Sequence, residues 1–411
     1  MTSTTARAAV ARTVREEGAR VVATLARMTR DVQLAEDAVQ DASIRALTAW
    51  EAEGIPDAPR AWLTVAARRR ALDLLRREAA RGGKEEEAIR VQNLFRAEPP
   101  DSDVPDDLLR LIFTCCHPAL STEAQVALAL RTLCGLSTAE VAHALLVPEA
   151  TMLKRLTRAK QKIKQARIPY RVPPAAELPD RVRGVVSVVY LLFNEGYVAT
   201  AGDTAIRTNL VDEATRLARL LHELMPDEPS VTGVLALMLL HDCRREARLD
   251  GRGDPVLLAD QDRSTWDPDK IRVGVELLGQ GLSRTPDRPD AYVVQAAIAA
   301  CHVLAPSYAT VPWSAIVSWY DVLLRVNDAP VVRLNRAIAV AELDGAAAGL
   351  AEVDAIPGLD TYAWWHATRA LLLAKLGRGA EAGRARADAL DLDANVVVHH
   401  GLRDVADTNQ G

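Results

Sequence analysis

Apolar residues recur at intervals of three and four along almost the whole chain, and this spacing limits the fold more than any other feature. Alanine, leucine and arginine dominate, whereas the alternation of β-branched residues that is typical of strands is rare. With 411 residues, 49% of them apolar, the chain is long enough for about two to four domains. We therefore predict an all-α globular protein.

Two segments interrupt the helical pattern and predict the domain boundaries. Residues 81–107 include RGGKEEE and EPPDSDVPDD, whose glycines, prolines and charges are typical of a flexible linker. Residues 168–180, IPYRVPPAAELPD, contain four prolines and predict a semi-rigid spacer. The predicted domains are 1–80, 108–167 and 181–411.

Charge is distributed unevenly between the front and the back of the chain. Residues 1–170 have a balance of +4, and the remaining residues have a balance of −9, although the whole chain carries only −5. A basic front and an acidic back indicate two parts with different partners, the first of them a candidate for binding a polyanion.

Residues 135–167 contain the most specific local sequence pattern of the chain. Ser137 and Glu140 predict a capping box that begins a short helix. A break follows at Val147, and Pro148 suits the first turn of a second, longer helix. These two helices predict a helix-turn-helix. The apolar stripe that we expect to pack inward consists of Met152, Leu156, Ala159 and Ile163.

The second helix is strongly basic. From Thr151 to Arg167 it contains seven Lys or Arg residues and no acidic residue, as contact with phosphates and guanines requires. A solvated surface helix is the alternative, but the capped first helix, the proline break and the unbroken positive charge together favour DNA binding. The residues predicted to contact DNA are Thr151, Lys154, Arg155, Arg158 and Lys162.

Two amphipathic helices are predicted upstream. In the first, Asp37 and Asp41 are four residues apart and share a face. In the second, from Pro59 to Glu78, one face is apolar and the opposite face is charged. The apolar face consists of Leu63, Ala67, Ala71 and Leu74, and the charged face of Arg69, Asp73 and Arg76. Each helix alone is also compatible with an ordinary structural role.

An acidic helix, a basic helix, a flexible linker and a helix-turn-helix follow one another in this chain. This order resembles that of the extracytoplasmic-function sigma factors of RNA polymerase. AEDAVQDASIRAL is similar to the segment with which that family grips the polymerase clamp helices, and PRAWLTVAARRRALDLLRR resembles the block beside the −10 element. LSTAEVAHALLVPEATMLKRLTRAK resembles the family's −35 reader. Leu146, Ala150 and Lys154 depart from the family pattern. We expect these differences to affect which promoter sequence is preferred more than they affect the fold.

The resemblance implies core RNA polymerase and promoter DNA as partners, and roles for individual residues. Trp62 is equally compatible with a core aromatic residue. The residues implied to bind core polymerase are Asp37, Gln40, Asp41 and Arg45. Those implied near the −10 element are Gly54, Asp57, Trp62, Arg68, Arg69, Arg76 and Arg77. Thr151, Lys154, Arg155 and Arg158 would enter the −35 groove, with Lys160, Lys162 and Lys164 on phosphates.

Residues 181–411 resemble the long C-terminal extension of one subgroup of these group 4 factors, which carries tetratricopeptide-like repeats. Leu343-Asp344-Gly345 ends one predicted helix and starts the next, and Leu376-Gly377-Arg378 does the same 33 residues later. This repeat of a helix, a glycine break and a second helix supports a helical-hairpin array. The candidate regulatory residues, from VYLLFNEGY and DQDRSTWD, are Asn194, Glu195, Tyr197, Asp262 and Trp266.

The resemblance implies regulation by the extension itself. We expect it to fold back on the basic front domains in the free chain; the rival interpretation is a docking surface required for activity, and an unknown protein or peptide partner stays open. Two other functions remain. One is a one-component helix-turn-helix activator with a helical-repeat sensor, which would leave the two amphipathic helices within residues 35–78 unexplained. The other is a helical scaffold, which would leave the basic helix from Thr151 to Arg167 unexplained.

The sequence lacks the patterns that would indicate a membrane protein, a secreted protein, a metal site or a common enzyme class. No apolar run approaches the roughly 18 residues that span a bilayer, and the start has no secretory signal, so we expect a cytoplasmic protein without a membrane partner. Five cysteines predict reduced thiols. Cys115, Cys116 and His117 lack a second pair at ligand spacing, so no metal or other cofactor is predicted. Phosphate-loop and hydrolase motifs are missing, and we do not expect an enzyme.

Overall fold

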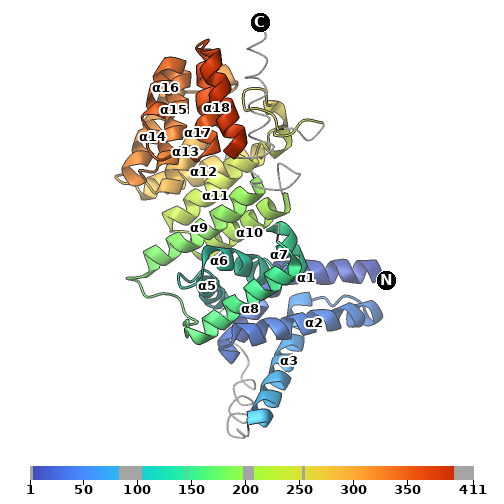
Figure 1. The fold of residues 1–411 in the computed structure, drawn as a ribbon. Helices are drawn as coiled ribbons and strands as arrows, with labels where there is room; N and C mark the ends of the chain where they lie inside the picture. The colour runs from blue at the N-terminus through green and yellow to red at the C-terminus, as the bar shows by residue number, and fades with distance from the viewer. Residues whose placement is uncertain (1–2, 83–103, 146, 198–207, 252–254, 393–411) are drawn as a thin grey trace. The chain divides into compact units, whose positions relative to one another are not determined.

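In a computed structural model of the chain, the described residues form helices joined by turns and contain no β-strand (Figure 1). The prediction of an all-α fold is confirmed. No helix in this part of the chain is long and apolar enough to cross a membrane. The chain forms two compact units, Met1–Leu191 and Leu192–Gly411, which are described separately. The described residues are 3–82, 104–145, 147–197, 208–251 and 255–392.

The first unit begins with three long helices that pack on one another: α1 (Ser3–Thr29), α2 (Val32–Glu53) and α3 (Pro59–Gly82). Their contacts are mostly alanines and valines, which allow close approach, and the buried Trp50 fills the space between α1, α2 and the start of α3. Most of the predicted linker 81–107 lies outside the described residues.

The same unit continues with a second group of shorter helices. Its first helix packs against α1, so the two helical groups are in contact within this unit (Figure 1). The elements are α5 (Val104–Cys115), α6 (Thr122–Leu128), a π-helical turn (Ala129–Leu133), α7 (Thr138–Ala144) and α8 (Glu149–Gln165). The predicted boundary between 1–80 and 108–167 remains a prediction.

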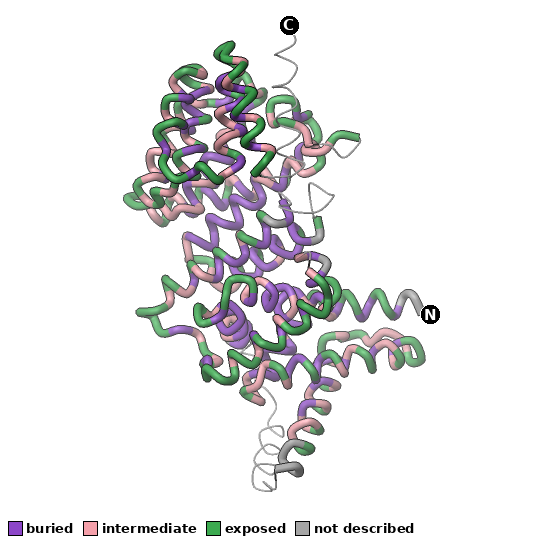
Figure 2. Tube along the Cα trace, in the orientation of Figure 1, coloured by how far each residue is buried: buried purple, intermediate pink, exposed green. Residues whose placement is uncertain are grey.

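The second unit is a succession of helices, in which the buried α11 packs against α10, α12 and α13. Every residue from Ser230 to Leu240 is buried, as Figure 2 shows for this helix. The elements are α10 (Thr208–Leu224), α11 (Pro229–Asp242), α12 (Pro268–Arg284), α13 (Ala291–Leu304), α14 (Trp313–Val326), α15 (Pro330–Asp344), α16 (Ala346–Asp354), α17 (Ala363–Lys375) and α18 (Gly379–Leu392). The helix α9 (Leu178–Tyr197) crosses the boundary between the units.

The last four helices pack in sequence, α15 on α16, α16 on α17 and α17 on α18. The two predicted breaks lie at the turns of the first and last of these pairs. Gly345 and Gly377 have φ values of 95° and 73°, a left-handed conformation that favours glycine. The helical hairpins therefore turn where the sequence places its glycines.

Candidate nucleic-acid interface

The predicted helix-turn-helix is present as α7 and α8. The capping box is confirmed: the Ser137 N–H donates to Glu140 Oε2 at 2.7 Å, and the Glu140 N–H donates to Ser137 Oγ at 3.1 Å. Pro148 is the N-cap of α8, one position before the first helical residue. Leu146, which departs from the family pattern, lies outside the described residues.

The apolar stripe of α8 packs inward as predicted. Met152, Leu156 and Ala159 are buried, and Ile163 is half-buried. Because α8 packs against α6 and α7 through this stripe, its opposite side faces outward.

The outward side of α8 carries the predicted DNA-contacting residues. Thr151, Lys154, Arg158 and Lys162 are exposed, and Arg155 is half-buried. None of these four cations forms an ion pair with a described residue. The positive charge on this face is therefore available to a polyanion.

Two other lysines of α8 form ion pairs with carboxylates at the N-cap and in the first turns of α2. Lys160 forms an ion pair with Glu36, and Lys164 Nζ lies 3.5 Å from Asp31 Oδ2. Glu36 is buried and also accepts a hydrogen bond from the Thr132 hydroxyl. Two of the three lysines that the resemblance assigns to phosphates thus bind acidic side chains of the same unit in this structure.

The residues implied to bind core polymerase lie along α2. Asp37, Gln40 and Arg45 are exposed, whereas Asp41 is half-buried and forms an ion pair with Arg70 of α3. Partial burial raises the pKa of Asp37, an effect that nearby Lys160 opposes.

One of these residues also contacts the second helical group. Gln40 Oε1 accepts a hydrogen bond from Arg131 Nη2 at 3.1 Å. Part of the predicted polymerase surface therefore touches the π-helical turn that precedes the helix-turn-helix.

A second set of contacts joins the two helical groups near α5. The carboxylate of Asp107, which is 1% exposed, accepts from Arg27 Nε at 2.8 Å and from Arg110 Nη1 at 2.9 Å. The Tyr170 hydroxyl lies 2.9 Å from the Ala23 carbonyl oxygen, and burial raises the pKa of this tyrosine. Sequence reasoning missed these residues, because periodicity does not identify partners far apart in the chain.

The loop implied to contact the −10 element connects α2 and α3. Gly54 ends α2 with φ 93°, and Asp57 is exposed. Trp62 is half-buried and packs edge-on against Trp50, with ring centroids 5.7 Å apart. This tryptophan therefore supports the local core and keeps part of its ring accessible.

The basic residues of α3 differ in their surroundings. Arg69, Arg76 and Arg77 are exposed, and Arg68 is half-buried. The opposite, apolar face is buried through Leu63, Ala67 and Ala71, as predicted, and Leu74 is half-buried.

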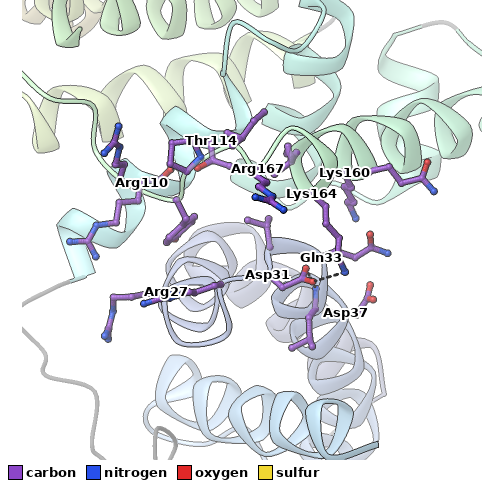
Figure 3. A pocket seen from close by; sticks show the side chains of 18 of the residues that line it. Arg27, Asp31, Gln33, Asp37, Arg110, Thr114, Lys160, Lys164 and Arg167 are labelled. Atoms are coloured by element: carbon purple, nitrogen blue, oxygen red, sulfur yellow. Dashed lines mark hydrogen bonds and ion pairs between the residues drawn. The ribbon is translucent and has the colours of Figure 1, made fainter. Parts of the chain in front are cut away.

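A cavity of about 1200 Å³ lies between the two helical groups of the first unit (Figure 3). The labelled side chains in the close-up come from α1, α2, α5 and α8, with Asp31 just before α2 and Arg167 just beyond α8. Lysines and arginines outnumber acidic residues in its wall. The cationic lining residues are Arg27, Arg30, Arg77, Arg110, Lys160, Lys164, Arg167 and Arg171.

The candidate regulatory residues lie in the second unit. Asn194 and Asp262 are exposed, and Asp262 caps a short turn by accepting from the Ser264 N–H at 2.9 Å. Tyr197 and Trp266 are buried. The side chain of Glu195 lies outside the described residues.

The cysteines of the first unit are buried thiols. Burial raises the pKa of Cys116 to about 12, and it raises that of Cys115 as well. Within the described parts of the chain, no group of three or more Cys, His, Asp or Glu residues is arranged to hold a metal ion.

Comparison with known families assigns both helical groups of the first unit. Residues 13–81 match Sigma-70 region 2, and residues 110–163 match Sigma-70 region 4. Residues 181–282 match a family of unknown function, DUF6596. Across 378 residues the chain is 40% identical to uncharacterized protein R00370 of Rhizobium meliloti (strain 1021), covering 90% of this chain and 89% of that protein.

The matched regions follow the same order along the chain as the helical groups of the structure. Region 2 corresponds to α1–α3, and region 4 corresponds to α5–α8. The match to R00370 extends through most of both units. The chain therefore belongs to the family of R00370, and its two sigma-70 regions followed by a DUF6596 domain make it a sigma factor of the extracytoplasmic-function-like type.

Proposed function

We propose that this protein binds core RNA polymerase, recognises −35 and −10 promoter elements and initiates transcription. The observation that carries the proposal is the outward face of α8, where Lys154, Arg158 and Lys162 are exposed and have no ion-pair partner among the described residues. On a second helix of a helix-turn-helix, such a face fits the major groove.

In the proposed −35 complex, the side chains nearest the start of α8 reach base edges. Arg155 and Arg158 supply guanidinium forks suited to guanine, and Thr151 and Lys154 lie beside them. Lys162, farther along the helix, contributes phosphate contact and salt-dependent affinity.

In the proposed −10 complex, the loop from Gly54 to Pro59 receives an unstacked base. Trp62 stands at the start of α3 beside this loop, with Arg68, Arg69, Arg76 and Arg77 along the same helix. Capture of the base offsets an unstacking cost of a few kcal/mol and so favours strand opening. Core polymerase binding is assigned to α2 through Asp37, Gln40, Asp41 and Arg45.

The two regions must separate for this function. The −35 and −10 elements are about 25 base pairs apart, roughly 80 Å of B-DNA, whereas regions 2 and 4 touch in the first unit. We assign the described arrangement to the free protein. Binding to polymerase would then release Lys160 and Lys164 from Glu36 and Asp31 for phosphate contact.

Regulation by the acidic C-terminal part completes the proposal. The balance of +4 in the front against −9 in the back supports an electrostatic contact between 181–411 and the sigma regions in the free chain. The successive helical hairpins at the C-terminal end support a tetratricopeptide-like array of the group 4 subgroup.

Initiation by purified components tests the first part of the proposal. The full chain is mixed with sigma-free core polymerase and a pool of genomic promoters, and transcripts are sequenced. We expect initiation without another sigma factor. Duplex binding without initiation favours the one-component activator instead, and neither binding nor initiation favours a scaffold.

Removal of residues 181–411 tests the regulatory part. If the extension inhibits the free protein, the truncated chain initiates more strongly than the full chain; abolished initiation contradicts inhibition and supports a required docking surface. Circular dichroism and binding of the truncated chain to core polymerase serve as controls for folding.

A further inference from the structure

Two sequence segments, one ending at Tyr197 of α9 and one spanning residues 260–267, meet at the C-terminal end of α11 and the turn that follows it. The Tyr197 hydroxyl donates to the His241 carbonyl oxygen at 3.2 Å. From the other segment, the Asp267 N–H donates to the Cys243 carbonyl oxygen at 2.8 Å. The end of α11 and the turn after it, residues 241–248, therefore place the two segments around one site.

Three arginines gather on the aromatic rings of this site. The Arg248 guanidinium carbon lies 3.6 Å from the centroid of the Tyr197 ring, and that of Arg244 lies 5.9 Å from the same centroid. The Arg263 guanidinium carbon lies 4.4 Å from the Trp266 ring. Arg244 also approaches the second segment, with its Nη1 3.5 Å from Gln261 Oε1.

The three arginines have no carboxylate partner among the described residues. Their neighbour Arg245 shows the contrast, because it forms ion pairs with Asp212 at 2.7 Å and with Asp242 at 2.6 Å. Cation–π contacts hold Arg244, Arg248 and Arg263 in place, and none of the three forms an ion pair with a described residue.

The site also contains buried polar atoms without a hydrogen-bond partner among the described residues. Arg263 Nη1 donates to the carbonyl oxygens of His302 and Ala305, at 2.8 Å each, while its Nη2 is buried and unpaired. The indole N–H of Trp266 and the His302 Nδ1 are likewise buried without a hydrogen-bond partner. Trp266 is 6% exposed. Such unpaired groups cost free energy unless an acceptor reaches them.

The electrostatics of the site agree with this geometry. Burial, together with Arg244 and Arg263, lowers the pKa of His302 to about 4. Burial, followed by Arg244, also lowers the pKa of Arg263. The site is thus a positive, partly desolvated environment that a bound anion would stabilise.

We propose that this arginine cluster, made of Arg244, Arg248 and Arg263 around Tyr197 and Trp266, binds the phosphate or carboxylate group of a small molecule. Guanidinium groups match both oxyanions through paired N–H donors, and the Trp266 indole N–H supplies a further donor. The cluster lies in the second unit, so this ligand site goes beyond promoter recognition and does not depend on it.

Titration of the full chain with inorganic phosphate, and separately with acetate, tests the proposal. Sodium chloride is adjusted to keep the ionic strength constant, and binding is followed by calorimetry and by the thermal unfolding midpoint. We expect saturable binding of at least one ion together with a raised midpoint. Phosphate binding alone identifies a phosphorylated ligand, and acetate binding alone identifies a carboxylate ligand.

Matched variants separate this site from general cation binding. Arg244→Gln removes a guanidinium with one weak hydrogen bond, so the fold should persist, and we expect roughly tenfold weaker binding, as for loss of one charged hydrogen bond. Arg219→Gln removes an exposed charge from α10 and should leave affinity unchanged. Trp266→Phe keeps an aromatic ring, removes the indole N–H and should also weaken binding.

Two results overturn the proposal. One is the absence of saturable binding for both ions. The other is equal affinity of the wild type and Arg244→Gln, with circular dichroism showing both folded.

Discussion

Lys160 of α8 forms an ion pair with Glu36 of α2, and both side chains are largely buried, at 15% and 7% exposure. Glu36 also accepts from Thr132, so one acidic side chain of region 2 binds two residues of region 4. This relationship connects α2 with α8, the two helices to which we assign polymerase binding and −35 recognition in the proposed function. The strength of the contact between the two regions can therefore be measured by substituting single side chains.

Lys160→Met should destabilise the first unit strongly. Removing one partner of a buried ion pair leaves the other charge uncompensated, at a cost of roughly 3–5 kcal/mol. The free energy of unfolding from urea titration measures this loss. Lys164→Met is the matched control on the same helix, because Lys164 is 77% exposed and 3.5 Å from Asp31. Its cost should stay below about 1 kcal/mol, and equal costs for the two variants would contradict the buried pairing.

Much of the local structure of α7 and α8 could be predicted from the sequence. The Ser137–Glu140 capping box and the inward stripe from Met152 depend on residues three and four positions apart, which helical geometry brings together regardless of the rest of the fold. The glycine turns at Gly345 and Gly377 are local in the same way.

The partners of the charged residues could not be predicted. The helix pattern places Lys160 beside the apolar stripe but does not show that Glu36, far away in the chain, lies opposite. The same holds for Asp107 with Arg27 and for the arginine cluster, where the two motifs meet only through the turn after α11. Periodicity identifies the face of a helix and leaves its tertiary neighbour undetermined.

Substitutions on the outward face of α8 should separate base recognition from phosphate contact. Arg158→Ala should cost about 1–3 kcal/mol of discrimination at one promoter position. Lys162→Ala should weaken binding to all sequences and reduce the slope of log K against log salt concentration by about 1. Binding of the polymerase complex to −35 variants over a salt series measures both effects.

Controls for these two substitutions come from the same chain. Both side chains are exposed, so thermal stability should stay within about 0.5 kcal/mol of the wild type. Arg219→Ala, on α10, should change neither the promoter preference nor the salt slope. An unchanged slope for Lys162→Ala would contradict its phosphate contact.

The second unit should lose stability in mild acid because of His302. Its pKa is about 4 in the folded chain, lowered by burial and by Arg244 and Arg263, whereas an unfolded histidine titrates near 6.5. The unfolded state therefore binds the proton first as pH falls, and the contribution present above pH 6.5 declines toward pH 4. Between pH 6.5 and 5.5 the loss due to His302 alone should be about 1 kcal/mol.

Urea titrations at these two pH values measure this loss. His302→Gln removes the titrating group and should show a smaller decline than the wild type by about 1 kcal/mol. Equal declines in the two proteins would show that His302 titrates normally in the folded chain.

Two glycines of the second unit should respond to alanine in opposite directions. A Cβ on Gly233 of α11 would lie 2.6 Å from the Val293 backbone nitrogen, so Gly233→Ala should cost about 1–3 kcal/mol or more through overpacking. Gly279 of α12 has nothing within 4 Å of that position, and Gly279→Ala should stabilise by about 0.5–1 kcal/mol through helix propensity. Thermal unfolding of both variants measures the contrast. A neutral Gly233→Ala would contradict the close packing of α11 against α13.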